Sequence, residues 1–275
     1  MCLIAFAIGA HPRWPLVIAA NRDEHYDRPT LPLQRWRSDS GQTIISGRDQ
    51  RAGGTWLGLS AKGRVAMLTN VREPHATPGG RSRGELPLAW LESGHSAESF
   101  FTDLDAHAFS GFNLVIGDLA AGQWHWLSNR QPGPGGVQVG WQQERLSAGV
   151  YGLSNAFMNT PWPKTVRLRQ TLTEVLAQTT QAQTLREQLW QALANRDQPP
   201  DDKLPRTGVP WPVEQELSSA LVRFSDGRYG TRSSMVVLAE AQATDRWHLS
   251  LEEKSWDPER LGDLRQENLQ WPAAS

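Results

Sequence analysis

The sequence has one cysteine in 275 residues, and this scarcity excludes several kinds of chemistry. A single thiol cannot form an internal disulfide, a thiolate zinc cluster, a CxxC redox pair or a CxxCH haem attachment. Neither sign of charge is in excess, because 28 Lys and Arg stand against 29 Asp and Glu. A net charge of −1 gives no electrostatic support for general binding of nucleic acid. We therefore expect no nucleic-acid partner.

Long apolar runs are also absent. The longest near the start spans residues 2–10, which is far too short to cross a membrane. It follows Met1 without a basic segment, is interrupted by Gly9 and is followed by Pro12, so it lacks the form of an export signal. We expect a cytoplasmic protein without a membrane span, in which the thiol stays reduced.

Signatures of common metal and nucleotide sites are missing as well: the chain has no HExxH, Walker A or GxGxxG motif. Asp23, Glu24 and His25 are adjacent, but successive residues rarely converge on one metal ion. Residues 132–136 read PGPGG, which predicts a flexible turn and lacks the lysine of a phosphate loop. We expect no metal site and no required cofactor.

Pairs of β-rich apolar runs recur along the chain and predict hairpins. They are residues 3–8 with 16–20, 55–60 with 64–70, 112–118 with 123–128, and 231–239 with 246–253. Apolar residues at helical spacing predict helices around 100–104, 168–176 and 185–193. This order predicts an α+β fold with largely antiparallel sheets and with helices segregated onto the outer faces.

Residues 198–212 contain five prolines and no predicted helix or strand. A loop of this length is typical of a lid, a binding loop or a disordered segment. It does not divide the chain, because the strand-rich segment after it is too short to build a core of its own. We therefore expect one domain over residues 1–275.

Tryptophan, in contrast, is abundant, with 13 copies. One interpretation is that the indoles pack the core and the surfaces between layers, with their N–H groups hydrogen bonded. The other is an aromatic pocket for a large flat or amphipathic ligand. The candidates for such a pocket lie in or beside predicted turns: Trp14, Trp56, Trp162 and Trp211.

The single cysteine lies at the start of the first predicted strand. Antiparallel pairing around the turn at residues 9–15 brings Arg22, or a residue close to it, opposite Cys2. A guanidinium beside a thiol favours the thiolate, and a carboxylate such as Asp23 can orient an N-terminal amine. The plainer alternatives are that Cys2 is a small core residue and that residues 21–24, NRDE, form a solvated turn.

Polar side chains also end or begin other predicted strands. Asn70 closes one strand and Asn155 closes another. Asparagine at a strand end is a common turn former, but its amide can also donate to a developing oxyanion. Arg232 leads into the apolar run after it, where it either protects a sheet edge or belongs to a site.

Removal of Met1, which is expected before a small residue, would give Cys2 a free α-amine with a pKa of roughly 8. The amine can then act as general base for the thiol of the same residue. Acyl transfer to sulfur releases an amine, and water completes the reaction. The natural reaction of such a residue is therefore amide hydrolysis.

Several motifs together resemble the NRDE family, whose eukaryotic members are named for transport and Golgi organisation. They are Cys2, NRDE at 21–24, GRDQRAGGTWLGLS at 47–60, LTNVR at 68–72, SRGEL at 82–86, GLSNA at 152–156 and TRSS at 231–234. The resemblance covers nearly the whole chain. It implies a branch of the N-terminal nucleophile (Ntn) hydrolase fold, a four-layer αββα sandwich of two antiparallel sheets between helical layers.

Within that fold the chain is similar to the penicillin V acylase and bile salt hydrolase group, and this similarity implies roles for six residues. Cys2 would be the nucleophile and its amine the base, with Arg22 tuning the thiol and Asp23 holding the amine. Asn70 and Asn155 would bind the oxyanion or orient the amine, and Arg232 would support the site electrostatically. The group usually separates the early Arg and Asp, whereas Arg22 and Asp23 adjoin here. Adjacent strand residues point to opposite faces, so both reach one site only where the strand has broken into a turn.

Two functions follow. The first is a cysteine-dependent hydrolase of a linear amide. The second is a carrier for haem or an acyl-CoA-like lipid, because eukaryotic members of the family are associated with haem trafficking and lipid homeostasis. Arg83, with Arg81, is a candidate to bind an anionic group such as a carboxylate or a CoA phosphate, although a solvated loop is the simpler interpretation. Candidate haem ligands are His75, His125 and His248, none marked by its spacing.

Overall fold

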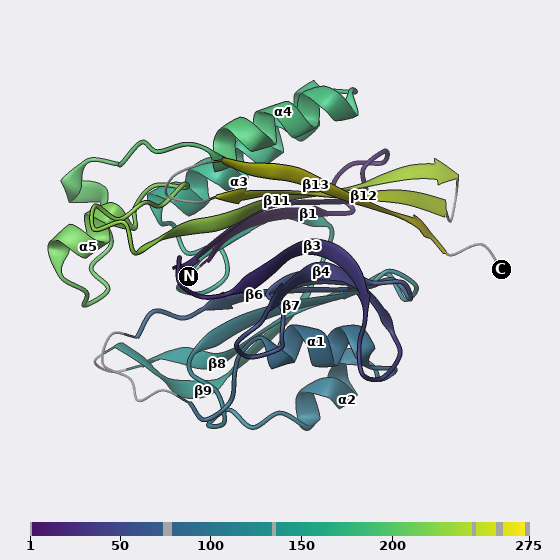
Figure 1. Cartoon of the computed structure of the whole chain (residues 1–275), viewed down its shortest axis with the longest axis horizontal. Helices are drawn as coiled ribbons and strands as arrows, with labels where there is room; N and C mark the ends of the chain where they lie inside the picture. Colours follow the sequence, from purple (N-terminus) through teal and green to yellow (C-terminus); the bar gives the residue numbers. More distant parts are fainter. Residues whose placement is uncertain (1, 74–78, 134–135, 244–245, 257–260, 273–275) are drawn as a thin grey trace.

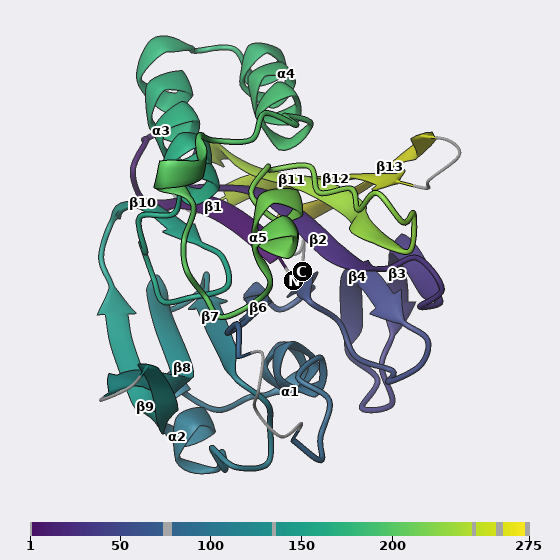
Figure 2. The same cartoon turned by 90° about the vertical axis from the view of Figure 1, so that its left-hand side faces the viewer.

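The computed structural model describes residues 2–73, 79–133, 136–243, 246–256 and 261–272. Two antiparallel sheets lie face to face, and helices cover the outer face of each (Figures 1 and 2). These four layers are the αββα sandwich that the sequence resemblance implies. No helix within the described ranges is long and apolar enough to cross a membrane.

The six-stranded sheet carries the start of the chain at its centre. Its order is β10-β1-β2-β11-β12-β13. The strands are β1 (Cys2–Ile8), β2 (Leu16–His25), β10 (Gly149–Leu153), β11 (Tyr229–Ala243), β12 (Arg246–Trp256) and β13 (Leu261–Trp271). Helices α3 (Pro163–Gln178) and α4 (Ala182–Leu193) pack on its outer face. A short 3-10 helix, η1 (Asp201–Lys203), and α5 (Trp211–Glu216) follow them.

The seven-stranded sheet takes its strands in chain order, from β3 to β9. They are β3 (Thr30–Arg37), β4 (Thr43–Asp49), β5 (Leu57–Ser60), β6 (Arg64–Asn70), β7 (Phe112–Asp118), β8 (Gln123–Gly133) and β9 (Gly136–Leu146). Its outer face is covered by α1 (Glu85–Glu92) and α2 (Ala97–Thr102). Sequential strands pair as neighbours, as the hairpin pattern of the sequence predicts, and the one long connection, between β6 and β7, carries α1 and α2.

Strand β1 shows why the layers form. All seven of its residues are buried, and side chains alternate between the two faces of the sheet. Ile4 and Phe6 enter the core between the sheets, whereas Leu3 and Ala5 enter the core under α3 and α4. A continuous apolar run is therefore required here, because both faces of this central strand are covered.

The expected hairpins and helices are all present, but the structure adds strands that the sequence pattern did not predict. These are β3, β4, β9 and β13, whereas β10 is the strand that the sequence predicts to close at Asn155, and it ends at Leu153. Most residues of β9 are exposed, so the strand carries no apolar alternation to detect. The PGPGG segment lies at the turn between β8 and β9, and its residues 134 and 135 are outside the described ranges.

Asn21, the first residue of the NRDE motif, anchors the helical layer. Its side-chain amide donates to the carbonyl oxygens of Leu193 at 2.9 Å and Ala220 at 2.8 Å. Its own oxygen accepts a hydrogen bond from the Ser234 hydroxyl at 2.5 Å. The residue is fully buried, so these bonds satisfy groups that water cannot reach.

Replacing this amide tests its structural role. Asn21→Ala leaves two buried carbonyls without their donor, and we expect the free energy of unfolding to fall by about 2–4 kcal/mol. Urea unfolding followed by tryptophan fluorescence measures the change. The control is Gln178→Ala at the exposed end of α3, which should stay within about 0.5 kcal/mol of the unchanged chain. Equal stability of the two variants would contradict the anchoring role.

Candidate functional site

The pairing of β1 with β2 brings Cys2 directly opposite Arg22, which is the register the sequence predicts. Both side chains lie on the face of the sheet that meets the second sheet. Asp23, the next residue, points to the other face, where Thr231 donates from Oγ1 to its Oδ1 at 2.8 Å. The strand does not break into a turn here, since β2 continues to His25.

Arg22 and Asp23 nevertheless line one cavity with Cys2, because the cavity lies where the sheet ends. Its volume is about 360 Å³. The walls come from the ends of β1 and β2, from β4, from the loop before β5, from β6, and from the segment before α1. The lining includes Cys2, Arg22, Asp23, Glu24, Arg28, Arg48, Asp49, Trp56, Asn70, Arg81, Ser82 and Arg83.

A pair of glycines sets the position of the arginine-bearing segment. The Thr55 amide donates to the Gly84 carbonyl at 3.1 Å. A Cβ placed on Gly54 would lie 2.3 Å from the backbone of Gly84, a distance that no side chain tolerates. The absence of a side chain at Gly54 therefore lets residues 79–84 approach the cavity closely.

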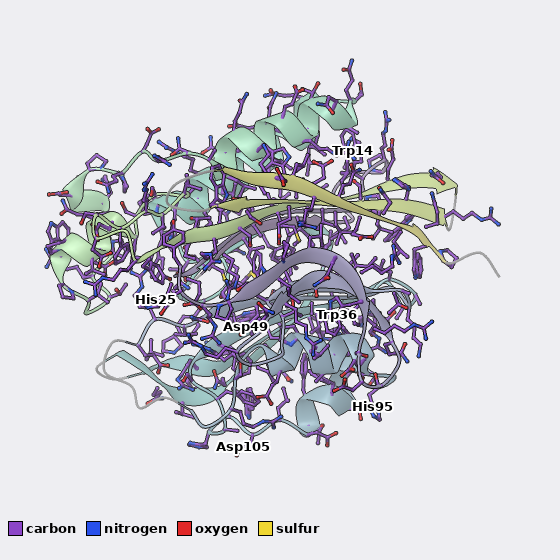
Figure 3. All side chains as sticks on the ribbon, viewed as in Figure 1. Trp14, His25, Trp36, Asp49, His95 and Asp105 are labelled. Carbon is purple, nitrogen blue, oxygen red and sulfur yellow. The ribbon has the colours of Figure 1, made fainter. Side chains whose placement is uncertain are left out.

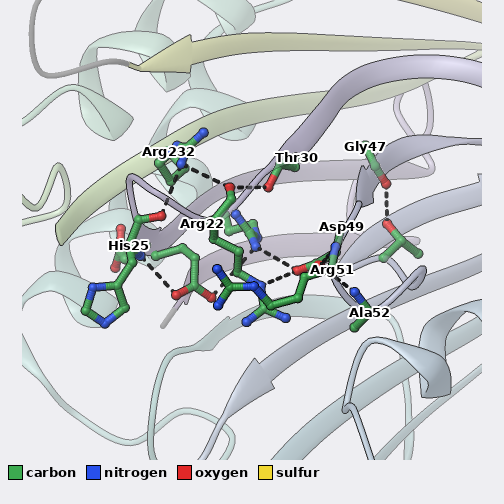
Figure 4. Close-up of polar contacts among 12 residues, drawn as sticks. Arg22, His25, Thr30, Gly47, Asp49, Arg51, Ala52 and Arg232 are labelled. Carbon is green, nitrogen blue, oxygen red and sulfur yellow. Dashed lines mark hydrogen bonds and ion pairs between the residues drawn. The ribbon is translucent and has the colours of Figure 1, made fainter. Parts of the chain in front are cut away.

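Carboxylates and guanidinium groups alternate on one wall of the cavity (Figure 4). The Arg22 guanidinium lies 3.5 Å from an Asp49 oxygen and 3.7 Å from a Glu24 oxygen, and Arg28 also pairs with Asp49. Burial alone would raise the pKa of Asp49, but bonds from Arg28 and the Ala52 amide, with the two arginine charges, lower it below its usual range. This wall therefore stays ionised at neutral pH.

The Cys2 thiol is 6 % exposed, and burial raises its pKa above the usual value for cysteine. The positive charge of the chain terminus and of Arg22 opposes this rise, while the charges of Asp23 and Glu24 add to it. The thiol is accordingly held protonated until a base removes its proton.

Two buried ionisable groups near this site gave no signal in the sequence. Lys164 in the first turn of α3 donates to the Leu217 carbonyl at 2.8 Å, and burial lowers its pKa to about 8 although the charge of Asp23 opposes the shift. Burial raises the pKa of Asp23 in turn, and the charge of Lys164 counters it. Glu253 on β12 faces an adjoining cavity of about 210 Å³ that Arg22 also lines. Only packing between distant segments brings these residues to the site.

The expected asparagines and the late arginine occupy different positions. Asn70 is half-buried and lines the cavity, whereas Asn155 is 1 % exposed and donates from Nδ2 to the Asn70 carbonyl at 3.1 Å. Arg232 is the extra residue of a bulge in β11 and donates from Nη1 to the carbonyls of His25 at 3.1 Å and Tyr26 at 2.5 Å. It therefore fixes the turn after β2 and lines the adjoining cavity (Figure 4).

The four candidate tryptophans also separate. Trp56 lines the cavity, and Trp162 stacks under the Arg72 guanidinium at 4.9 Å. Trp14 is fully buried in the core under the helices and stacks on His11, and Figure 3 shows it on that side of the sheet, away from Asp49. Trp211 is exposed at the start of α5. The structure thus corrects the pocket assignment for Trp14, Trp162 and Trp211, which do not line this cavity: Trp14 packs in the core, Trp162 packs on Arg72, and Trp211 lies on the surface.

The two described candidate haem ligands, His125 and His248, do not line the cavity either. His125 lies beside Glu98 and Phe101 on the seven-stranded sheet, and His248 contacts Gln270. His75 is outside the described residues. No group of three or more His, Cys, Asp or Glu side chains suited to hold a metal ion occurs in the part of the chain that the structure describes.

The Pro-rich segment 198–212 is anchored beside the cavity end of the sheets. Arg72, two residues after Asn70, donates from Nη1 to Glu214 at 2.7 Å and to the Thr207 hydroxyl at 3.2 Å. Thr207 also donates from its amide to Glu214 at 2.8 Å. The Arg72 and Glu214 side chains are both almost fully buried, so this contact fixes the segment to the end of β6.

Comparison with known proteins places the chain in a family. The model of the family described as Transport and Golgi organisation 2 matches residues 1–257. The chain belongs to that family. It is 34 % identical over 281 residues to the Bos taurus "Transport and Golgi organization protein 2 homolog", covering 94 % of this chain and 96 % of the relative. The Drosophila melanogaster "Transport and Golgi organization protein 2" is 28 % identical over 264 residues, covering 88 % and 89 %.

Solved structures with some likeness to this Transport and Golgi organisation 2 family member include two hydrolytic enzymes. One is the Caenorhabditis elegans N-acylethanolamine-hydrolyzing acid amidase ortholog, with a TM-score of 0.48 and 12 % identity over 68 % of this chain and 85 % of that one. The other is the C2A mutant of conjugated bile acid hydrolase from Clostridium perfringens, with a TM-score of 0.45 and 7 % identity over 97 % and 96 %.

The charge of Arg22 should be measurable through the only thiol of this family member. The charge of the guanidinium lowers the pKa of Cys2. In a plot of alkylation rate against pH, Arg22→Met should therefore shift the midpoint to higher pH and slow the reaction near neutral pH about 3- to 10-fold. Arg22→Lys should keep most of the effect. Iodoacetamide labelling followed by mass spectrometry gives the profile. The exposed Arg228→Met is the control, and an unmoved midpoint in Arg22→Met would contradict the coupling.

Glu253 should make stability depend on pH. Burial raises its pKa to about 7 from an ordinary 4.5, so the folded chain holds a proton that the unfolded chain releases between these values. The stability linked to that proton is complete below pH 4.5 and is lost as the pH rises through 7. Glu253→Gln keeps an oxygen to accept the Leu33 amide bond, which is 2.9 Å long in the unchanged chain.

We therefore expect the free energy of unfolding of Glu253→Gln, relative to that of the unchanged chain, to increase by on the order of 1–3 kcal/mol when the pH is raised from 5 to 8. Urea unfolding at the two pH values measures this gain. Glu144→Gln, on the exposed surface of β9, is the matched control and should show no such difference. A gain that is the same at both pH values would argue against a buried, protonated Glu253.

Proposed function

We propose that this chain is a cysteine-dependent hydrolase of linear amide bonds, with Cys2 as an N-terminal nucleophile once Met1 is removed. The observation that carries the proposal is the position of Cys2, which begins β1 at a cavity, opposite Arg22 and beside Asp23. The family relationship and the four-layer sandwich are consistent with it. A cytoplasmic location, where thiols stay reduced, is part of the proposal.

The proposed reaction begins when the Cys2 amine takes the proton from its own Sγ. The sulfur then attacks the amide carbonyl carbon, and the oxygen becomes an oxyanion. As the C–N bond breaks, the ammonium returns the proton to the leaving amine, which leaves a thioester. A water molecule gives one proton to the amine and its oxygen attacks the thioester carbon. As the C–S bond breaks, the ammonium returns that proton to the sulfur, which releases a carboxylic acid and restores the thiol and the neutral amine.

The surrounding residues have complementary roles in this proposal. The raised pKa of the buried thiol means that it needs the amine as base, since little thiolate is present beforehand. The positive charge of Arg22 stabilises the sulfur anion once it forms, and Asp23 holds the amine. Asn70, which lines the cavity, donates to the oxyanion, and Asn155 holds Asn70 through its carbonyl.

A carrier function is the second candidate, and the arginines of the cavity wall favour it for an anionic ligand such as an acyl-CoA-like molecule. Haem carriage lacks such support, because the described residues of the lining include no histidine. Titration with haem, followed by Soret absorbance, and with acyl-CoA, followed by calorimetry, tests this candidate. The carrier function would be favoured if a ligand binds saturably and the rate of amide hydrolysis is the same in the unchanged chain and in Cys2→Ala.

The hydrolase proposal predicts that the purified protein begins at Cys2 and cleaves members of a panel of N-acyl amides. Cys2→Ala should lower the rate by at least about 10³-fold, because it removes the nucleophile. Intact mass spectrometry and detection of the released amine provide the two measurements.

A matched variant separates the thiol from the amine. Insertion of Glu between Met1 and Cys2 keeps the thiol but moves the free amine away from it, so hydrolysis should be lost while alkylation of Cys2 continues. Full hydrolysis by Cys2→Ala, or quantitative retention of Met1 in an active enzyme, would contradict the mechanism.

A further inference from the structure

Five arginines line the cavity that contains Cys2, against three carboxylates, those of Asp23, Glu24 and Asp49. The guanidinium groups of Arg22 and Arg28 are already paired with Asp49. Arg81 pairs with Glu85 on the exposed side of α1. The excess of positive charge in the lining therefore rests on the two remaining residues, Arg48 and Arg83.

Arg83 is half-buried and has little to balance its charge. The hydrogen bond recorded for it runs from Nη1 to the Gly111 carbonyl at 3.3 Å, although a guanidinium has five N–H donors. Among the described residues, no carboxylate lies within ion-pair distance of it. Burial lowers the pKa of Arg83, the charges of Cys2 and Glu24 oppose that shift, and the side chain lines the same cavity as the thiol.

Arg48 has a similar environment on the facing segment. Its Nε donates to the Gly53 carbonyl at 3.0 Å, and its guanidinium lies over the Trp36 ring at 4.5 Å. Within the described ranges it too has no carboxylate at ion-pair distance. Gly53 precedes Gly54, and Gly54 packs on Gly84 next to Arg83, so the close glycine contact holds the two arginine-bearing segments together.

Such an arrangement favours an anion. Removing a guanidinium from water without a counter-ion is unfavourable, and a carboxylate or phosphate that accepts two parallel hydrogen bonds restores the lost interactions. The carboxylates of Asp49 and Glu24 do not fill this role, because they lie against Arg22 and Arg28 on the other part of the wall.

We propose that the ligand of this cavity carries a carboxylate or phosphate group that Arg83 binds, assisted by Arg48, while its amide reaches Cys2. The part of this proposal that concerns the substrate rests on the proposed hydrolase function, and it narrows the substrates to anionic N-acyl amides. The part that concerns binding of an anion depends only on the positions of the arginines.

Binding can be tested without catalysis in the full chain carrying Cys2→Ala. Isothermal titration calorimetry with three probes compares the anions with a neutral reference: N-octanoylglycine, N-octanoyl phosphoethanolamine and the neutral N-octanoylglycinamide. We expect at least one anionic probe to bind 10-fold or more tightly than the neutral one. The tighter of the two anions identifies a carboxylate or a phosphate site.

Substitution of Arg83 in this background tests the assigned residue. Arg83→Met should weaken the anionic probe about 10- to 100-fold and leave the neutral probe unchanged, whereas Arg83→Lys should lose less because it keeps the charge. Arg228→Met, on the exposed surface, is the control. Unfolding midpoints confirm that the variants fold.

Three results would overturn the proposal: equal affinity for charged and neutral probes, equal weakening of both by Arg83→Met, or no saturable binding of either anion. Failure of the hydrolase function gives a different result. Anionic probes would then bind through Arg83, but the unchanged chain would release no amine from them. Hydrolysis of the neutral probe alone would support catalysis and reject the anion site.

Discussion

The register between β1 and β2 is the constraint on which the site depends. Both strands lie at the centre of a sheet whose two faces are buried, so a slip by one residue would move apolar side chains into the wrong core. The same register fixes Cys2 opposite Arg22 and directs Asp23 to the opposite face. Packing of the core therefore fixes the register of β1 and β2, and this register in turn fixes the position of Cys2, the candidate nucleophile.

The electrostatics of the cavity result from a balance between burial and arginine charge. Burial disfavours the ionised forms of Cys2 and Asp23, and it destabilises the charge of Arg83. On the wall where arginines contact carboxylates, Asp49 stays ionised. Both effects act on the thiol: burial raises its pKa, and the charge of Arg22, directly opposite it, lowers it. Arg83 lines the same cavity. A protonated thiol in the same cavity as the guanidinium of Arg83, which is unpaired among the described residues, suits an anion that brings its amide to the sulfur.

The parts of this site that could be predicted from the sequence are those set locally. The opposition of Cys2 and Arg22 follows from turn length and from the two-residue period of a strand, and the four layers follow from the hairpins and helices with the family motifs. Lys164 and Glu253 could not be predicted, because only packing between distant segments buries them. Trp14 looked like a pocket residue because it lies beside a turn, but the turn folds it under the helices.

The segment 198–216 contributes a buried negative charge, that of Glu214, to the group of charges beside the site. Glu214 is buried against Arg72, and burial lowers the pKa of Arg72 while the charges of Glu214 and Asp23 oppose that shift. Lys164 lies in the same group of charges. Because an isolated buried charge is costly, these residues stabilise one another as a set. Undocking of this segment would remove Glu214 and leave Arg72 and Lys164 with less negative charge beside them. The docked segment therefore helps to set the field in which Asp23 and the start of the chain are held.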